Sequence, residues 1–168
     1  MSIAENIAAV RSRIAAAAES AGRRPEDILL VGASKMNDAA ACREAIAGGL
    51  TALGENRVQE LLEKDAQGAY AGAALHFIGR LQRNKVKYLV GRVDLIESID
   101  SLALLQEVQR LAEKRGVTQD ILLEVSAAGE ESKGGLPMTE VYSAAEAALG
   151  MPNVRVRGLM TIPPVCAD

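Results

Sequence analysis

The apolar positions along the chain follow two alternating patterns, one with helical spacing and one of short unbroken runs. The first helical stripe contains Ile3, Ile7, Val10 and Ile14. Ser2 precedes it, and Glu5 follows Ser2 by three residues, which is the spacing of a capping box. The pattern therefore predicts a helix that begins after Ser2 and ends near Gly22.

The unbroken runs predict strands. The first is Asp27–Ser34, whose apolar residues do not alternate with polar ones, as is typical of a strand buried on both faces in a parallel sheet. Five further strands are predicted along the chain: Leu50–Leu53, Leu75–Ile78, Val93–Ile96, Ile121–Val125 and Val154–Met160.

Segments with helical spacing separate these strands. They are a short helix capped by Asn37 or Asp38 and ending at Ile46, one from Val58 that fades by Gly68, a basic helix Arg80–Val90, a helix Leu102–Lys114 capped by Asp100 or Ser101, and Met138–Leu149. Six strands that alternate with helices predict a parallel sheet built from βα units, in one domain that spans residues 1–168.

Lys35 directly follows the first predicted strand, and parallel strands carry the chemistry of α/β folds at their C-terminal ends. Partial desolvation there disfavours the ammonium form, so Lys35 could supply a nucleophilic amine that forms a Schiff base with an aldehyde such as pyridoxal phosphate. The alternative is that Lys35 extends from a strand end into water.

Composition restricts the classes of function. The 168 residues carry a net charge of −3, with 49% hydrophobic and 24% charged residues, so neither nucleic acid nor an anionic membrane is an expected partner. The two cysteines, Cys42 and Cys166, are too far apart in the sequence for a metal-binding or redox motif, and the chain has only one histidine. The N-terminus lacks a continuous apolar segment, so we expect neither a signal peptide nor a membrane span. We therefore expect a cytoplasmic location.

Three further features each have two interpretations. Arg80, Arg83, Lys85, Lys87 and Arg92 form either a solvated basic surface or a site for anions. His76, inside a predicted strand, is either a hydrogen-bonded structural residue or an acid–base group. The glycine-rich loop Gly129–Gly135 contains Lys133, which is either an exposed lysine or a second amine for the aldehyde.

Several motifs occur in order along the chain: Ala33-Ser34-Lys35, Gly54–Glu60, His76–Lys85, Ser98–Ser101, Gly129–Gly135 and Arg157–Pro164. Together they closely resemble motifs of the pyridoxal-phosphate homeostasis proteins, the YggS/PROSC family. The resemblance implies a TIM-type (β/α) barrel of the alanine racemase N-terminal domain type with an extra N-terminal helix.

The resemblance also implies a function. Lys35 would hold pyridoxal 5'-phosphate as a Schiff base, with Asn56, His76 and Met160 near the cofactor. The protein would be a non-catalytic carrier in intracellular cofactor homeostasis, with apo pyridoxal-phosphate enzymes as recipients. Family members are monomers, and association of this shorter chain stays open.

The sequence departs from the family at its end, because it stops at Asp168, where family members continue for two more strands and their helices. Six of the eight barrel strands would then be present, and Ser126 stands where the family usually has Asn. We expect exposed apolar surface at Ile28–Val31 and Val154–Met160.

Two other functions remain open. One is a racemase-like enzyme, disfavoured because Tyr70, Tyr88 and Tyr142 are expected away from the strand ends and offer no second acid–base group. The other is a fragment that no longer binds the cofactor.

Overall fold

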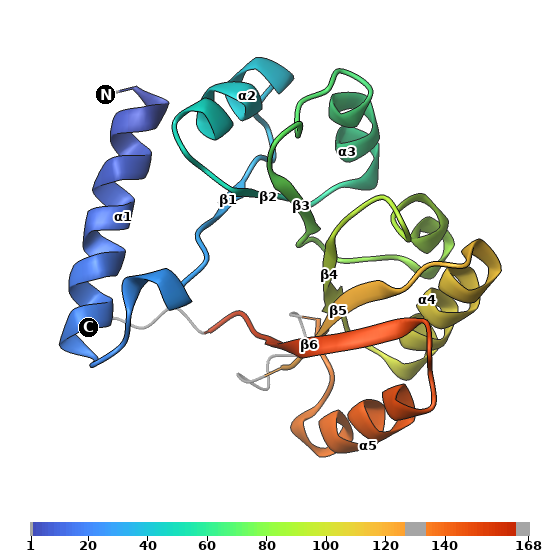
Figure 1. The fold of residues 1–168 in the computed structure, drawn as a ribbon. Coiled ribbons are helices and arrows are strands. Elements are labelled where there is room, and N and C mark those ends of the chain that lie inside the picture. The colour runs from blue at the N-terminus through green and yellow to red at the C-terminus, as the bar shows by residue number, and fades with distance from the viewer. Residues whose placement is uncertain (1, 127–133, 164–168) are drawn as a thin grey trace. The chain divides into compact units, whose positions relative to one another are not determined.

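The computed structural model describes residues 2–126 and 134–163 of the chain, which form two compact units, Met1–Leu75 and His76–Asp168 (Figure 1). The first unit contains α1 (Ile3–Ser20), the 3-10 helix η1 (Pro25–Asp27), β1 (Val31–Ala33), α2 (Ala39–Ala47), β2 (Ala52–Glu55) and α3 (Val58–Asp65). Strand β3 (Ala74–Phe77) crosses the boundary. The second unit continues with the 3-10 helix η2 (Arg83–Tyr88), β4 (Leu95–Ile99), α4 (Leu102–Arg115), β5 (Gln119–Glu124), α5 (Met138–Leu149) and β6 (Val154–Met160).

The strands follow one another in the sheet in the order of the sequence, from β1 to β6. Each pair whose register is described is parallel: β1 with β2 in the first unit, and β3 with β4, β4 with β5 and β5 with β6 in the second. The predicted parallel sheet with sequential strands is confirmed.

Local signals set the ends of several helices. Ser2 and Glu5 form the predicted capping box, because the Glu5 amide donates to Ser2 Oγ and the Ser2 amide donates to Glu5 Oε2 at 2.7 Å. Asp38 caps α2 and Ser101 caps α4, each accepting a hydrogen bond from an amide three residues later. Gly116 ends α4 in the left-handed conformation, with φ 65°.

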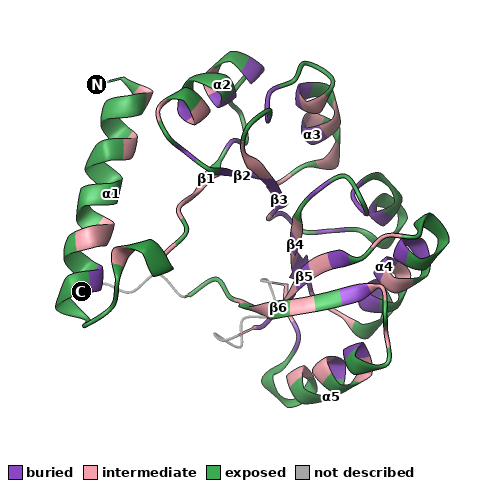
Figure 2. Ribbon diagram, in the orientation of Figure 1, coloured by how far each residue is buried: buried purple, intermediate pink, exposed green. Residues whose placement is uncertain are grey.

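Helix α1 packs against α2 but is mostly exposed (Figure 2). The Arg11 guanidinium donates to the Gly49 carbonyl at 2.5 Å. A Cβ atom at Gly48 would lie only 3.2 Å from Ala4 Cα, so the absence of a side chain there lets the two helices approach closely.

The first strand is shorter than predicted and is not buried on both faces. Residues Pro25–Asp27 form η1, and pairing starts only at Val31, opposite Ala52. Leu29 is 57% exposed, and Ile28 and Leu30 are half-buried. The prediction was wrong because the length of an edge strand depends on its neighbour, and β2 begins only at Ala52.

The predicted basic helix Arg80–Val90 is also wrong, since the segment forms only the short η2. Val86 within η2 and Leu89 directly after it are both buried, and their spacing of three residues matches the three residues per turn of a 3-10 helix. Strands β2 and β4 lie two or three residues further along the chain than predicted, so Gly54 and Glu55 belong to β2.

In the second unit, α4 contacts β5 and β6, and α5 contacts β6. The buried stripe of α4 consists of Leu104, Leu105, Val108, Leu111 and Ala112. Figure 2 shows the buried residues concentrated on the central strands and on one side of α4. At β6 every second residue is exposed, and Leu159 is exposed for 61%, in line with the apolar surface expected there.

Candidate functional site

Lys35 lies in a turn after β1, and Ser34 separates it from Ala33, the last residue of the strand. We call Ser34–Asn37 the Lys35 turn. The Asn37 amide donates to the Ser34 carbonyl at 3.1 Å, and Asn37 Nδ2 donates to the Lys35 carbonyl at 3.2 Å. Met36 has φ 64°, which is uncommon for a residue with a side chain. Lys35 is exposed, so the expected partial desolvation is not found.

Asn56 lies beside the Lys35 turn at the end of the neighbouring strand. The register places Ala33 opposite Gly54, and the Ser34 amide continues it by donating to the Gly54 carbonyl at 3.0 Å. Lys35 and Asn56 therefore follow paired strand ends. Asn56 Oδ1 is buried and has no hydrogen-bond partner among the described residues. The structure thus brings two of the four predicted site residues together.

A buried polar cluster supports the Lys35 turn, and we call Ser34, Glu55, Lys64 and Tyr70 the Glu55 cluster. Glu55, the last residue of β2, is fully buried. Its Oε1 accepts hydrogen bonds from the Ser34 hydroxyl at 2.6 Å, from Lys64 Nζ at 2.7 Å and from the Tyr70 hydroxyl at 3.0 Å. The Glu55 Oε2 atom has no partner in the part of the chain that is described.

The sequence analysis missed the Glu55 cluster and misplaced Tyr70, whose hydroxyl reaches a strand end although its backbone lies in a loop. Burial raises the pKa of the Tyr70 hydroxyl above its usual value, and the Glu55 carboxylate raises it further. One signal was present in the sequence, namely a glutamate two residues after the predicted strand Leu50–Leu53, because a carboxylate that is buried at a strand end requires a donor.

His76 and Met160 belong to the second unit, on β3 and β6, with β4 and β5 between these strands in the sheet order. His76 is buried, and its Nδ1 lies 2.7 Å from Glu97 Oε1 on β4, as in the hydrogen-bonded structural interpretation. Met160 is half-buried at the end of β6, where its carbonyl accepts the Val125 amide at 2.8 Å.

Acidic side chains gather at other strand ends of the second unit. A Cβ atom at Gly134 would lie 3.6 Å from Glu124 Oε1 and 3.7 Å from Asp100 Oδ2, so both carboxylates lie close to Gly134. Burial raises the pKa of the Glu124 carboxyl and Asp100 raises it further, whereas Arg80 lowers it. The sequence analysis did not single out Glu124.

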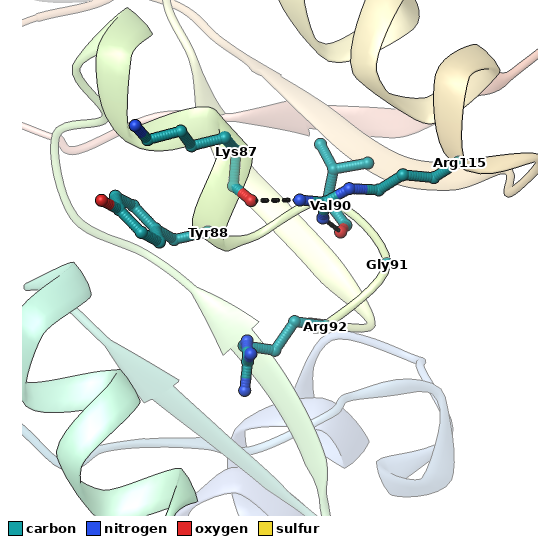
Figure 3. Close-up of a pocket in the computed structure, with 6 residues that line it drawn as sticks. All are labelled: Lys87, Tyr88, Val90, Gly91, Arg92 and Arg115. Atoms are coloured by element: carbon teal, nitrogen blue, oxygen red, sulfur yellow. Dashed lines mark hydrogen bonds between the residues drawn. The ribbon is translucent and has the colours of Figure 1, made fainter.

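The basic surface borders a groove lined by Lys87, Tyr88, Val90, Gly91, Arg92 and Arg115 (Figure 3). The Arg115 guanidinium donates to the carbonyls of Val90 and Lys87, and the side chains of Lys87 and Arg92 point away from each other (Figure 3). Because these charges do not converge on one point, the groove fits the interpretation of a solvated basic surface.

Metal and thiol chemistry have little support in the residues that the structure describes. Within 2–126 and 134–163, no three His, Cys, Asp or Glu side chains are placed to share a metal ion. Cys42 is buried, and burial raises the pKa of its thiol. Cys166, Lys133 and most of the loop Gly129–Gly135 lie outside the described residues.

Every helix in the described ranges is too short or too polar to cross a membrane.

Residues 3–168 match the family model of the alanine racemase N-terminal domain. The pyridoxal phosphate homeostasis protein of Aquifex aeolicus is 46% identical over 164 residues, which cover 98% of this chain and 72% of the relative. The protein of the same name in Escherichia coli K12 is 39% identical, with 96% and 70% covered. The structure of PipY from Synechococcus elongatus with PLP bound has a TM-score of 0.84 and 32% identity, and covers 98% of this chain and 72% of PipY.

These matches explain the sequential parallel sheet as part of a TIM-type barrel, and they agree with the resemblance found in the motifs. The chain belongs to the alanine racemase N-terminal domain family and, within it, to the pyridoxal phosphate homeostasis proteins.

Proposed function

We propose that the protein binds pyridoxal 5'-phosphate through the amine of Lys35 and serves in the homeostasis of this cofactor. The relatives carry that name, and PipY contains PLP in its structure. The observation that carries the proposal in this chain is the placement of Lys35 and Asn56 after neighbouring, paired strands. Among the described residues, the Lys35 amine is exposed without an ion pair, and the buried Oδ1 atom of Asn56 has no partner.

These two residues fit the cofactor chemically. Pyridoxal phosphate supplies an aldehyde that condenses with a primary amine and releases water. Lys35 offers that amine in a turn open to solvent, where a ligand can reach it. Asn56 Oδ1 can accept a hydrogen bond from a hydroxyl or a protonated nitrogen, which would remove the cost of a buried acceptor without a partner.

A carrier fits the surroundings of Lys35 better than an enzyme does. Amino-acid chemistry on this cofactor needs a group that moves a proton at the reacting carbon. In the first unit, Lys64 and Tyr70 each donate a hydrogen bond to Glu55, and the raised pKa of Tyr70 disfavours the ionised form that a base requires. We therefore propose a non-catalytic role, which racemase, decarboxylase and transaminase assays at high protein concentration can contradict.

The attachment site can be mapped directly. The chain is incubated with pyridoxal phosphate, reduced with borohydride and digested, and the labelled lysine is identified by mass spectrometry. We expect label on Lys35 that disappears in Lys35→Ala and persists in the exposed control Lys85→Ala. Label on Lys85 or Lys133 that is unchanged by Lys35→Ala would contradict the proposal.

The remaining assignments stay predictions. The resemblance implies cofactor contacts by His76 and Met160 and apo enzymes as recipients of the cofactor, and the N-terminal sequence predicts a cytoplasmic location. Substitution of His76 by Asn and of Met160 by Leu, followed by measurement of cofactor affinity, tests the first of these.

A further inference from the structure

We propose that Glu55, Glu60 and Lys64 are positioning residues, which hold the Lys35 turn in the conformation that presents the Lys35 amine. This inference rests on the proposed function, because it takes Lys35 as the residue that attaches the cofactor. None of the three carries out chemistry. They act on the backbone on either side of Lys35.

Both neighbours of Lys35 are bonded to α3. On one side, Lys64 Nζ donates to the Ser34 carbonyl at 2.8 Å, and the Ser34 hydroxyl donates to Glu55 Oε1. On the other side, the Met36 amide donates to Glu60 Oε2 at 3.2 Å. Glu60 and Lys64 are one helical turn apart on α3, and Lys64 Nζ lies 3.7 Å from Glu60 Oε2.

The buried ammonium of Lys64 gives a physical reason for Ser34 to stay in place. Lys64 is only 7% exposed, and a charge removed from water must be paired and hydrogen-bonded. Its acceptors are the Ser34 carbonyl and Glu55 Oε1, with Glu60 as a second carboxylate nearby. Ser34 cannot move away from Lys64 without leaving the ammonium with fewer acceptors, so the backbone before Lys35 is held in place.

The conformation of Met36 shows that the turn needs such support. A left-handed backbone costs free energy for a residue with a side chain, and Met36 is neither glycine nor asparagine. The residue is 91% exposed, so packing of Met36 itself does not stabilise the conformation. The stabilisation must come from its backbone contacts, of which the hydrogen bond to Glu60 is one. A strained residue next to a reactive one is a frequent feature of ligand-binding turns.

The first test is made on the chain without added cofactor, by NMR measurement of hydrogen exchange at the Met36 amide. Glu60→Ala removes the acceptor and should speed exchange roughly two- to tenfold, the value of one hydrogen bond. Glu60→Gln keeps an acceptor oxygen and should leave the rate unchanged. Lys64→Met should also speed exchange, whereas the control Gln119→Met, which removes another buried side chain bonded to a backbone carbonyl, should not.

The second test measures how fast pyridoxal phosphate attaches to Lys35 in the same variants, and how the rate depends on pH. A displaced amine should react roughly tenfold more slowly or worse in Lys64→Met and Glu60→Ala, with rescue in Glu60→Gln. The inference would be overturned if the Met36 amide exchanged at an unchanged rate in both Lys64→Met and Glu60→Ala, or if Gln119→Met sped its exchange equally. It would also be overturned if exchange became faster while the rate of cofactor attachment stayed the same. Failure of the wild-type chain to attach the cofactor at Lys35 would overturn the proposed function instead, while the exchange rates still decide whether α3 holds the turn.

Discussion

Removal of the Lys64 ammonium should destabilise the fold far more than loss of an ordinary lysine. In Lys64→Met the side chain keeps its apolar stem, but Glu55, which is fully buried, loses its cationic partner at 2.7 Å. Loss of one partner from a buried ion pair costs about 3–5 kcal/mol. The hydroxyls of Ser34 and Tyr70 still donate to Glu55 Oε1, so we expect the lower end of this range, about 3 kcal/mol.

Urea unfolding at pH 7 measures this change, and thermal unfolding should show a fall of about 6–12 °C for a chain of this length. The exposed lysine Lys85 is the matched control, because Lys85→Met should change stability by no more than about 0.5 kcal/mol.

A double-mutant cycle separates the ion pair from packing. Glu55→Gln replaces the carboxylate by a neutral amide of nearly the same shape, so Lys64→Met in that background no longer leaves a buried charge without its cation. The loss of unfolding free energy in the double variant should therefore be smaller, by at least about 1.5 kcal/mol, than the sum of the losses in the two single variants. If Lys64→Met costs less than about 1 kcal/mol, or if the two effects simply add, then the pair is solvated and our account of the Glu55 cluster is wrong.

Three further predictions concern other parts of the chain. Gly48→Val should loosen the contact of α2 with Ala4 and lower the melting temperature, because even a Cβ atom at Gly48 would lie 3.2 Å from Ala4 Cα. Ser101→Ala should cost about 1 kcal/mol in urea unfolding through loss of the α4 cap, whereas Ser101→Asp should not. The folded-state pKa of Glu124 is raised by burial and by Asp100, so the folded chain holds this proton more tightly than the unfolded chain does. The contribution of Glu124 to stability is thus present at low pH, and it declines as pH rises from the ordinary glutamate range through the folded pKa. Glu124→Gln should remove this decline in urea unfolding measured from pH 4 to 8.

Several elements could be predicted from the sequence because their signals are local. Helix α5 and strand β6 have the predicted bounds, and α4 begins at its predicted cap and ends before Gly116. A capping hydroxyl or a glycine at a helix end acts on backbone groups within one turn, so the sequence contains both partners of each interaction. The family could be recognised for a related reason, since its motifs are short and occur in order.

Tertiary structure decided where the edge strand ends and what surrounds Lys35. The apolar run Asp27–Ser34 does not contain its own pairing partner, so only the position of β2 limits β1 to Val31–Ala33 and leaves Lys35 in an exposed turn. The Glu55 cluster joins residues that are up to 36 positions apart, from Ser34 to Tyr70, and neither their spacing nor their periodicity marks them as neighbours. A buried charge needs a partner wherever the fold can supply one, and that choice depends on three-dimensional packing, which the order of residues along the chain does not display.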